Sequence, residues 1–169
     1  LQSDPWSYSL NISTLATSTN RNMARASSNE FENAGQKSIT KPHAFVAMPF
    51  TQKMYDVFHY GIQQPVHKVG FLCERIDEQT FTGDILDQMK KKIETASVVI
   101  AELTGANPNV YLEVGYAWGK KRPTILLAEE EQALLFDIHG QKCLKYNSIK
   151  SLEEMLEKEL KELQRQNLI

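Results

Sequence analysis

The residue with the most informative chemical setting is Glu113, which lies shortly after the segment Asn107-Pro108-Asn109. A proline restricts the preceding residue to extended backbone, so Asn107 belongs to a loop. Asn109 is a good N-cap for a helix that begins at Val110. Glu113 would then fall in about the first helical turn, where free N–H groups and the helix dipole favour an ionised carboxylate.

A carboxylate in this place can attack an electron-poor sugar carbon, C1′, or stabilise it while an N-glycosidic bond breaks with oxocarbenium character. An acidic residue near a helix start can also do no more than complement the dipole, worth about 0.3–1 kcal/mol. The residues alone leave both interpretations open. Gly115 and Ala117 would let a ligand or a neighbouring element approach this helix, and Tyr116 adds a ring.

Strand-like apolar runs alternate with helical patterns from Ala44 onward, separated by short connections. This order predicts a flavodoxin-like (Rossmann-like) α/β fold, in which about five parallel strands carry helices on both faces. Ser97–Leu103 reads as a strand covered on both faces. Expected strands cover 44–48, 70–76, 97–103, 123–128 and 142–146. Expected helices cover 52–68 (ended or kinked at Pro65), 82–96, 110–120 and 151–166.

Ligands of such sheets bind at the carboxyl ends of the strands, near the point where the strand order reverses. The loops after the first four strands are therefore expected to hold the site. After the first strand, Met48, Pro49 and Phe50 could pack on a base. After the second, Arg75 could bind a phosphate through two hydrogen bonds, or form an ion pair with Asp77 or another carboxylate. Both roles of Arg75 stay open at this point.

Composition bounds the class of protein. The chain has 169 residues, of which 41% are hydrophobic, so one domain with an appendage is expected. Residues 1–42 are rich in Ser, Thr and Asn and are interpreted as a flexible arm or linker, and residues 43–169 as the domain. With 19 basic and 21 acidic residues, the charge gives nucleic-acid binding no support. No apolar run reaches the ~18–20 residues of a membrane span, which makes the cytoplasm the simplest location.

Several common kinds of site are not indicated. The sequence contains no CxxC motif or Cys/His cluster, and its four histidines lack triad or metal spacing. It also lacks the GxGxxG and GxxxxGK[ST] patterns of dinucleotide and P-loop sites. We therefore expect neither a metal nor a bound cofactor. Cys73 and Cys143 lie in apolar runs and are expected to be buried, reduced thiols.

Three segments carry a resemblance to a known family: HAFVAMPF, LCERIDEQTFTGDILDQMKKKIETASVVIAELTGANPNVYLEVGYAWGKKRPTILLAE and FDIHGQKCLKY. They resemble the bacterial nucleoside 2-deoxyribosyltransferase-like family, a group that also covers TIR-like nucleotide-binding domains. The resemblance spans residues 43–146, with the elements in the family's order. The stretch NPNVYLEVGYA is its most specific part.

The resemblance implies roles for individual residues. In the transferases, a glutamate in an E-x-G-Y/A segment is the nucleophile that forms a covalent sugar–enzyme intermediate. That role falls on Glu113, followed here by Gly115 and Tyr116. An acidic residue at the end of the third strand helps to hold the sugar or base. Relatives often have Asp there, and this chain has Glu102.

The leading hypothesis is therefore an enzyme that cleaves or transfers the N-glycosidic bond of a small-molecule nucleoside or nucleotide. Glu113 would act as nucleophile, and four residues would orient the sugar: Glu102, Asn107, Asn109 and Asp77. One alternative is NAD⁺ cleavage by a TIR-like domain. Another is a non-catalytic nucleotide-sensing module of a larger signalling or defence protein.

A third alternative is an assembly domain. Leu152, Leu156, Leu160 and Leu163 form an apolar stripe near the end of the sequence. The repeat is too short for several heptads, which favours packing on the domain's own sheet over a coiled coil. Because a neighbouring subunit completes the site in the related transferases, the resemblance also makes a homo-oligomer an option, alongside a larger multidomain protein.

Overall fold

A computed structural model describes residues 42–76, 85–134 and 140–169, all of which belong to one compact unit, Lys41–Ile169. The arm expected over residues 1–42 lies outside the described residues except for Pro42. Asp77 and the expected helix start at residues 82–84 lie outside them too.

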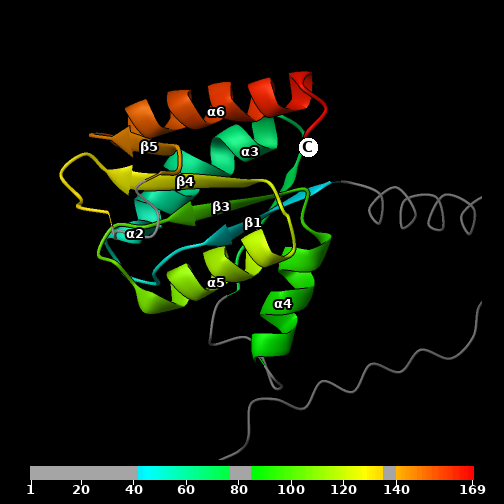
Figure 1. Ribbon diagram of the computed structural model, residues 1–169. Helices are drawn as coiled ribbons and strands as arrows, with labels where there is room; N and C mark the ends of the chain where they lie inside the picture. Colours follow the sequence, from blue (N-terminus) through cyan, green and yellow to red (C-terminus); the bar gives the residue numbers. More distant parts are fainter. Residues whose placement is uncertain (1–41, 77–84, 135–139) are drawn as a thin grey trace, which may run out of the picture. The chain divides into compact units, whose positions relative to one another are not determined.

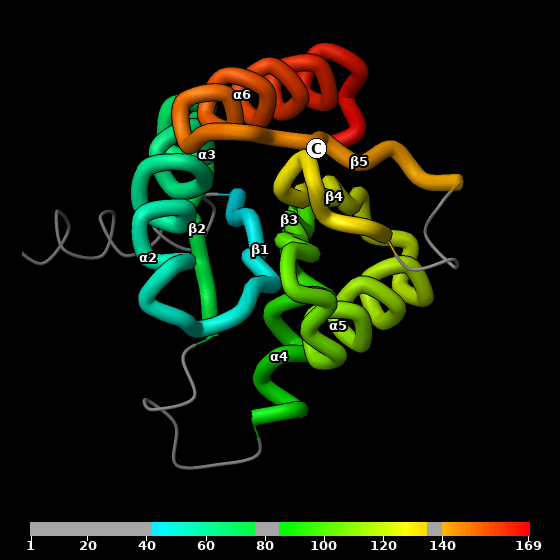
Figure 2. Tube along the Cα trace, turned by 90° about the vertical axis from the view of Figure 1, so that its left-hand side faces the viewer, coloured from blue at the N-terminus to red at the C-terminus, as the bar shows by residue number. Residues whose placement is uncertain are grey.

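The five described strands form one parallel sheet in the order β2-β1-β3-β4-β5 (Figures 1 and 2). They are β1 (His43–Ala47), β2 (Leu72–Glu74), β3 (Val98–Glu102), β4 (Thr124–Glu129) and β5 (Cys143–Tyr146). This architecture confirms the predicted α/β fold. The order reverses between β1 and β3, which places the topological switch point at their carboxyl ends.

Helices cover both faces of the sheet, as Figures 1 and 2 show. On one face lie α2 (Met54–Asp56), η1 (Val57–Gln63), α3 (Gln64–Lys68) and α6 (Ile149–Arg165). On the other lie α4 (Ile85–Thr95) and α5 (Pro108–Gly119). Side chains alternate along β3: Val98 and Ile100 enter the core under α6, whereas Val99 and Ala101 enter the core under α5.

The helix expected to end or kink at Pro65 instead changes type before it and continues to Lys68. Residues Val57–Gln63 form a π-helix, and α3 begins at Gln64, so Pro65 occupies the start of the next α-helical segment. There its missing N–H costs little. The wider π turns also relieve the conflict between a proline ring and the carbonyl four residues earlier.

The helix α6 packs on its own domain, as its leucine stripe predicts. Leu152, Leu156 and Leu160 are fully buried in the core that α6 shares with η1 and β1. Ser148 and Ser151 form a capping box at its start. Of the helices in the described residues, none is long and apolar enough to cross a membrane.

Both cysteines are free thiols and partly buried, close to the sequence-based expectation. Burial raises the pKa of Cys73 to about 12 and also raises the pKa of Cys143. Because the thiolate is the reactive form, neither cysteine is set up as a nucleophile.

Candidate functional site

A cavity of about 670 Å³ opens at the carboxyl ends of the strands, beside the switch point between β1 and β3. Its walls come from the β1–α2 loop, the residues after β2, the start of α4 and the start of α5. The lining residues are Met48, Pro49, Phe50, Thr51, Ile76, Ile85, Leu86, Met89, Asn107, Asn109, Val110, Leu112 and Glu113. The volume falls in the range of small-molecule sites, and the position is where open α/β sheets bind ligands.

The wall that carries Glu113 is shaped by the start of α5. Asn107, not Asn109, is the N-cap: its backbone is extended, and its Oδ1 accepts a 2.9 Å hydrogen bond from the Asn109 backbone N–H. The sequence-based cap was therefore wrong by two residues. The reason is Pro108, which excludes helical backbone at Asn107 and suits the first helical position itself.

Glu113 consequently lies in the second turn of α5, and the first turn contains no acidic residue. Its side chain is half-buried, and desolvation raises its pKa to about 7. Within the described part of the chain, Glu113 has no hydrogen-bond or ion-pair partner. The helix start therefore does not support the Glu113 carboxylate as the sequence suggested, and desolvation opposes its ionised form.

Glu102 faces the other side of the sheet. It follows Val98 and Ile100 on the α6 side of β3, because alternate residues of a strand share a face. Its side chain is fully buried and accepts hydrogen bonds from the Thr104 backbone N–H at 3.2 Å, from the Thr104 hydroxyl, and from the Tyr146 hydroxyl at 3.0 Å.

Burial raises the pKa of Glu102, while hydrogen bonds from Thr104 and Tyr146 oppose that rise. Thr104 also accepts a 2.9 Å hydrogen bond from the Glu129 backbone N–H, so this network joins the ends of β3, β4 and β5. Glu102 is not among the described residues that line the cavity. The structure therefore does not bring Glu102 and Glu113 together.

The β1–α2 loop contributes Met48, Pro49 and Phe50 to the cavity, where the sequence analysis expected them. Arg75 supports this wall. Its guanidinium lies 4.8 Å from the ring centre of Phe50 and 4.2 Å from that of Phe58, and its Nη1 is 3.9 Å from Met48 Sδ. Arg75 itself is not one of the described lining residues.

Two further residues named from the sequence lie away from the cavity. Gly115 is exposed, and no atom of another element lies within 4 Å of the place where a Cβ would be. The Tyr116 hydroxyl donates a 2.6 Å hydrogen bond to Glu94, which also pairs with Lys120 at 2.7 Å. Tyr116 therefore joins α5 to α4.

Sequence reasoning missed the apolar side of the cavity. Ile85, Met89 and Ile93 recur at helical spacing along α4. Met89 and Ile93 are buried, whereas Ile85 and Leu86 are exposed and border the cavity. Leu112 on α5, 58% exposed, completes this rim. Nothing in the sequence around Leu112 marks this exposed leucine as a cavity residue.

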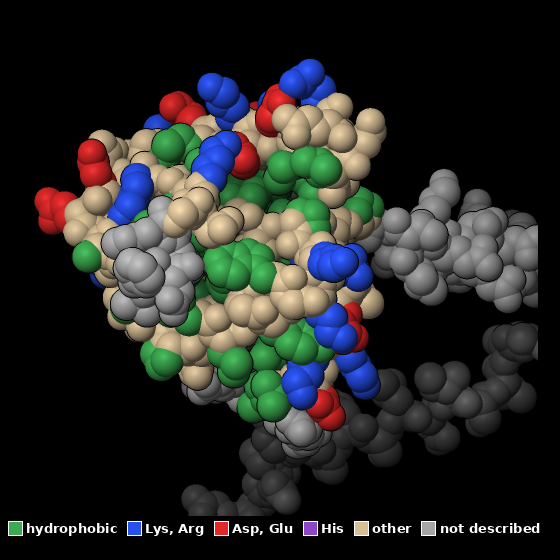
Figure 3. Space-filling model, in the orientation of Figure 1, with side chains coloured by type: hydrophobic (Ala, Val, Ile, Leu, Met, Phe, Trp, Pro, Cys, Tyr) green, Lys and Arg blue, Asp and Glu red, His purple; other side chains and the backbone are tan. Residues whose placement is uncertain are grey.

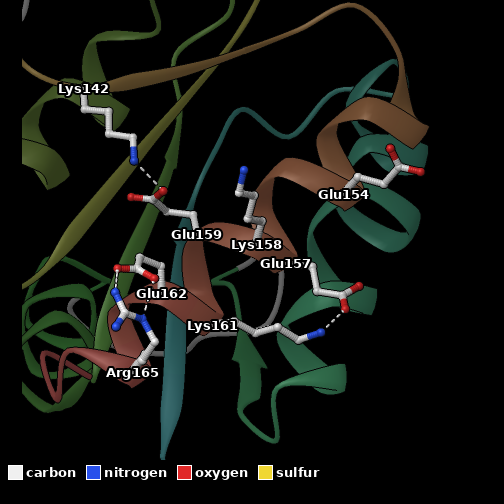
Figure 4. A pocket seen from close by; sticks show the side chains of 8 residues that line it. All are labelled: Lys142, Glu154, Glu157, Lys158, Glu159, Lys161, Glu162 and Arg165. Atoms are coloured by element: carbon white, nitrogen blue, oxygen red, sulfur yellow. Dashed lines mark hydrogen bonds and ion pairs between the residues drawn. The ribbon is translucent and has the colours of Figure 1, made fainter.

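A second hollow, on α6, differs in character (Figure 4). Charged side chains line it, and several pair with each other: Lys142 with Glu159, Lys161 with Glu157, and Arg165 with Glu162. Figure 3 shows Lys, Arg, Asp and Glu side chains along the edge of the molecule formed by α6. Solvated ion pairs of this kind are typical of an exposed helix surface, and we assign no ligand to this hollow.

No family model and no curated protein matches the sequence. Among solved structures, the CMP N-glycosidase BcmB from Clostridium botulinum matches with a TM-score of 0.54 and 18% identity, over 68% of this chain and 98% of that one. A fungal multi-domain GH3 β-N-acetylglucosaminidase, whose structure includes a GCN5-related glucosamine N-acetyltransferase region, matches with a TM-score of 0.46 and 17% identity. That match covers 69% of this chain but 14% of the fungal chain.

At these identities the likeness to BcmB shows a shared fold, and the fungal match carries no conclusion. The fold and the cavity together define an α/β domain with a cavity of small-molecule size at its switch point. The fold is thus similar to that of a protein described as a CMP N-glycosidase. The TIR-like part of the sequence resemblance finds no support in these comparisons.

Proposed function

We propose that this domain cleaves the N-glycosidic bond of a nucleoside or nucleotide, with Glu113 as the nucleophile. The observation that carries the proposal is a desolvated carboxyl group, with a pKa of about 7, on the wall of a cavity of about 670 Å³. Two lines of support are independent of that geometry: the sequence around Glu113 resembles the transferase segment, and the fold is shared with a CMP N-glycosidase.

In the proposed reaction, an oxygen of ionised Glu113 forms a bond to C1′ while the C1′–N bond breaks and its electron pair stays on the base. A water molecule then attacks C1′, the sugar–Glu113 ester opens, and Glu113 leaves as a carboxylate. The proton that the water loses is taken up by the departed base, which leaves as the neutral free base. The products are the free base and the sugar, and a second base in place of water would make the reaction a transfer.

The surroundings of Glu113 suit this chemistry. Positive charge develops on the sugar ring as the base departs, and a carboxylate in a water-poor cavity stabilises it more strongly than one in bulk water. Desolvation disfavours the ionised form of Glu113 before the reaction, which is why its pKa is raised. Asn107 uses Oδ1 for the helix cap, so its amide N–H group can donate to a sugar hydroxyl.

The test is to incubate the protein with ribo- and deoxynucleosides, their 5′-monophosphates and NAD⁺, and to follow base release by chromatography. We expect release by the wild type and a loss on the order of 10³-fold or more in Glu113→Gln. Glu94→Gln is the matched control, because Glu94 lies on the neighbouring helix and is not among the described cavity residues. Glu94→Gln should retain activity.

Two outcomes would overturn the proposal. Base release that persists in Glu113→Gln would show that Glu113 is not the nucleophile. An inactive wild type whose melting temperature still rises with a nucleoside or nucleotide would favour a binding module without turnover. Release of nicotinamide alone would keep Glu113 as nucleophile but move the substrate to NAD⁺.

A further inference from the structure

The charge of the cavity wall bears on the form of the substrate. Of the described lining residues, Glu113 is the one whose side chain ionises, and its charge is negative. The neutral polar groups are Thr51, Asn107 and Asn109, and the rest of the wall is aliphatic, aromatic or thioether. Such a wall offers hydrogen bonds to sugar hydroxyls and an apolar surface to a base.

A phosphate placed beside this wall would act against the proposed reaction. A phosphate dianion near Glu113 is a like charge, and a like charge disfavours ionisation of a carboxyl group. The pKa of Glu113, already raised by desolvation, would rise further, and less of the nucleophilic form would be present. The described lining residues include no cationic side chain that would compensate for the lost hydration of the phosphate.

Arg75 is the cation that the sequence suggested as a phosphate ligand, and its contacts indicate a different role. The guanidinium lies against the rings of Phe50 and Phe58, with Nη1 near Met48 Sδ. Phe50 and Met48 line the cavity, so Arg75 contacts the wall through residues that face the ligand. Cation–π contacts of this kind hold a ring in a defined orientation.

We propose that the cavity takes a neutral nucleoside in preference to its 5′-phosphate. In this proposal Arg75 is a positioning residue that acts through Phe50 and does not bind a phosphate. The inference rests on the proposed function. A nucleoside substrate would differ from CMP, the nucleotide in the name of the CMP N-glycosidase BcmB.

The experiment compares kcat/KM for cytidine with CMP, deoxycytidine with dCMP, and adenosine with AMP. We expect the nucleoside of each productive pair to be preferred at least tenfold. A preference for the monophosphate would overturn the proposal. If the wild type releases no base from either member, the proposed function fails. Calorimetric binding then decides the substrate form: tighter binding of the nucleoside supports it, and tighter binding of the monophosphate, or no binding of either, overturns it.

Arg75 variants test the proposal that Arg75 positions Phe50 and does not bind a phosphate. Arg75→Met should raise KM for nucleoside and monophosphate by the same factor, about 3–10-fold, with kcat nearly unchanged. Phe50→Leu should raise KM similarly, and adding Arg75→Met to it should raise KM little further, because both changes disturb one wall. Arg75→Lys, which keeps a cation over the rings, should restore part of the loss.

Three results would contradict a positioning role for Arg75. One is a loss in Arg75→Met that is confined to the monophosphate, which would identify a phosphate ligand. Another is a double variant in which the effects of Arg75→Met and Phe50→Leu on KM combine in full, as they would for independent sites. The third is a melting temperature that falls with KM unchanged, which would indicate a structural role alone.

Discussion

Two glutamates near the same end of the sheet show how the surroundings set the properties of a carboxyl group. Glu102 is fully buried, yet three hydrogen-bond donors on two residues surround it. Glu113 is less buried but lacks such donors in the described part of the chain. The carboxyl group without partners is the one that faces the cavity, where a reacting sugar could supply the missing positive charge.

The first prediction at this scale concerns the pH dependence of activity. The nucleophile must be ionised, and the pKa of Glu113 is about 7. We therefore expect kcat/KM to fall about tenfold per pH unit well below pH 7 and to level off above about pH 8. Initial rates between pH 5 and 9 give the profile. A flat profile across this range would contradict the assignment of Glu113 as nucleophile.

A second prediction concerns stability and does not depend on the reaction. Burial raises the pKa of Glu113 from 4.5 in the unfolded chain to about 7, so between these values the folded state binds more protons. The contribution of Glu113 to the free energy of unfolding is thus most favourable below pH 4.5, and falls as the pH rises through 7. Glu113→Gln removes the ionisation and should stabilise the protein at pH 8 by about 1–3 kcal/mol.

Urea denaturation of wild type and Glu113→Gln at pH 5 and pH 8 measures this difference. The stabilising effect should be several times larger at pH 8 than at pH 5. Glu94→Gln serves as the control, because Glu94 pairs with Lys120 and Tyr116, which lower its pKa. An equal effect of Glu113→Gln at both pH values would mean that desolvation does not raise the pKa of Glu113.

At the scale of elements, the start of α5 positions the cavity wall. Asn107→Ala should destabilise the protein by about 1 kcal/mol, because the Asn109 N–H loses its acceptor. It should also lower kcat/KM, since the turn that precedes Glu113 becomes less ordered. Asn107→Asp keeps an acceptor and should restore stability. Denaturation curves and initial rates of the three proteins measure both effects, and an unchanged stability in Asn107→Ala would contradict the assigned cap.

The sequence predicted the elements well because their signals are local. Apolar runs located all five strands, and leucine spacing located α6 and its buried face. The helix cap was displaced because Asn107 and Asn109 are both good caps, and only the geometry around Pro108 selects between them. The site residues were harder to predict from the sequence than the elements. Ser97–Leu103 is apolar on both faces, which hides the alternation that turns Glu102 away from α5.

The contacts that form the cavity wall are not local, and no spacing rule encodes them. Arg75 contacts Phe50 and Phe58 only after β1 and β2 pair. Its contacts with the aromatic rings therefore depend on tertiary structure and could not be predicted from spacing. Glu113 was found from its motif, but its raised pKa depends on the neighbouring elements that exclude water from it. Asp77 lies outside the described residues, so its expected role stays a prediction.

At the scale of the whole domain, α6 stabilises the fold from the side opposite the cavity. Leu156→Ala should lower the free energy of unfolding by about 2–5 kcal/mol, because Leu156 is fully buried and its loss leaves a hole. The exposed Leu168, changed to Ala, should shift it by less than about 0.5 kcal/mol. Urea denaturation measures both. At a temperature where Leu156→Ala is folded, its kcat/KM should stay within about twofold of wild type.

A large loss of activity in folded Leu156→Ala would mean that α6 and the cavity are coupled through the sheet. The oligomeric state and the membership of a larger multidomain protein stay predictions.

The position of α6 in the sequence has a consequence for biosynthesis. The helix follows all five strands, yet its leucines cover a core that contains Ala44 and Val46 of β1, the first strand of the sheet. A nascent chain can bury the α4–α5 side of the sheet while the residues that α6 will cover are still exposed. Folding on the ribosome should therefore pause at a half-closed intermediate, a state prone to aggregate or to recruit a chaperone until α6 has been synthesised.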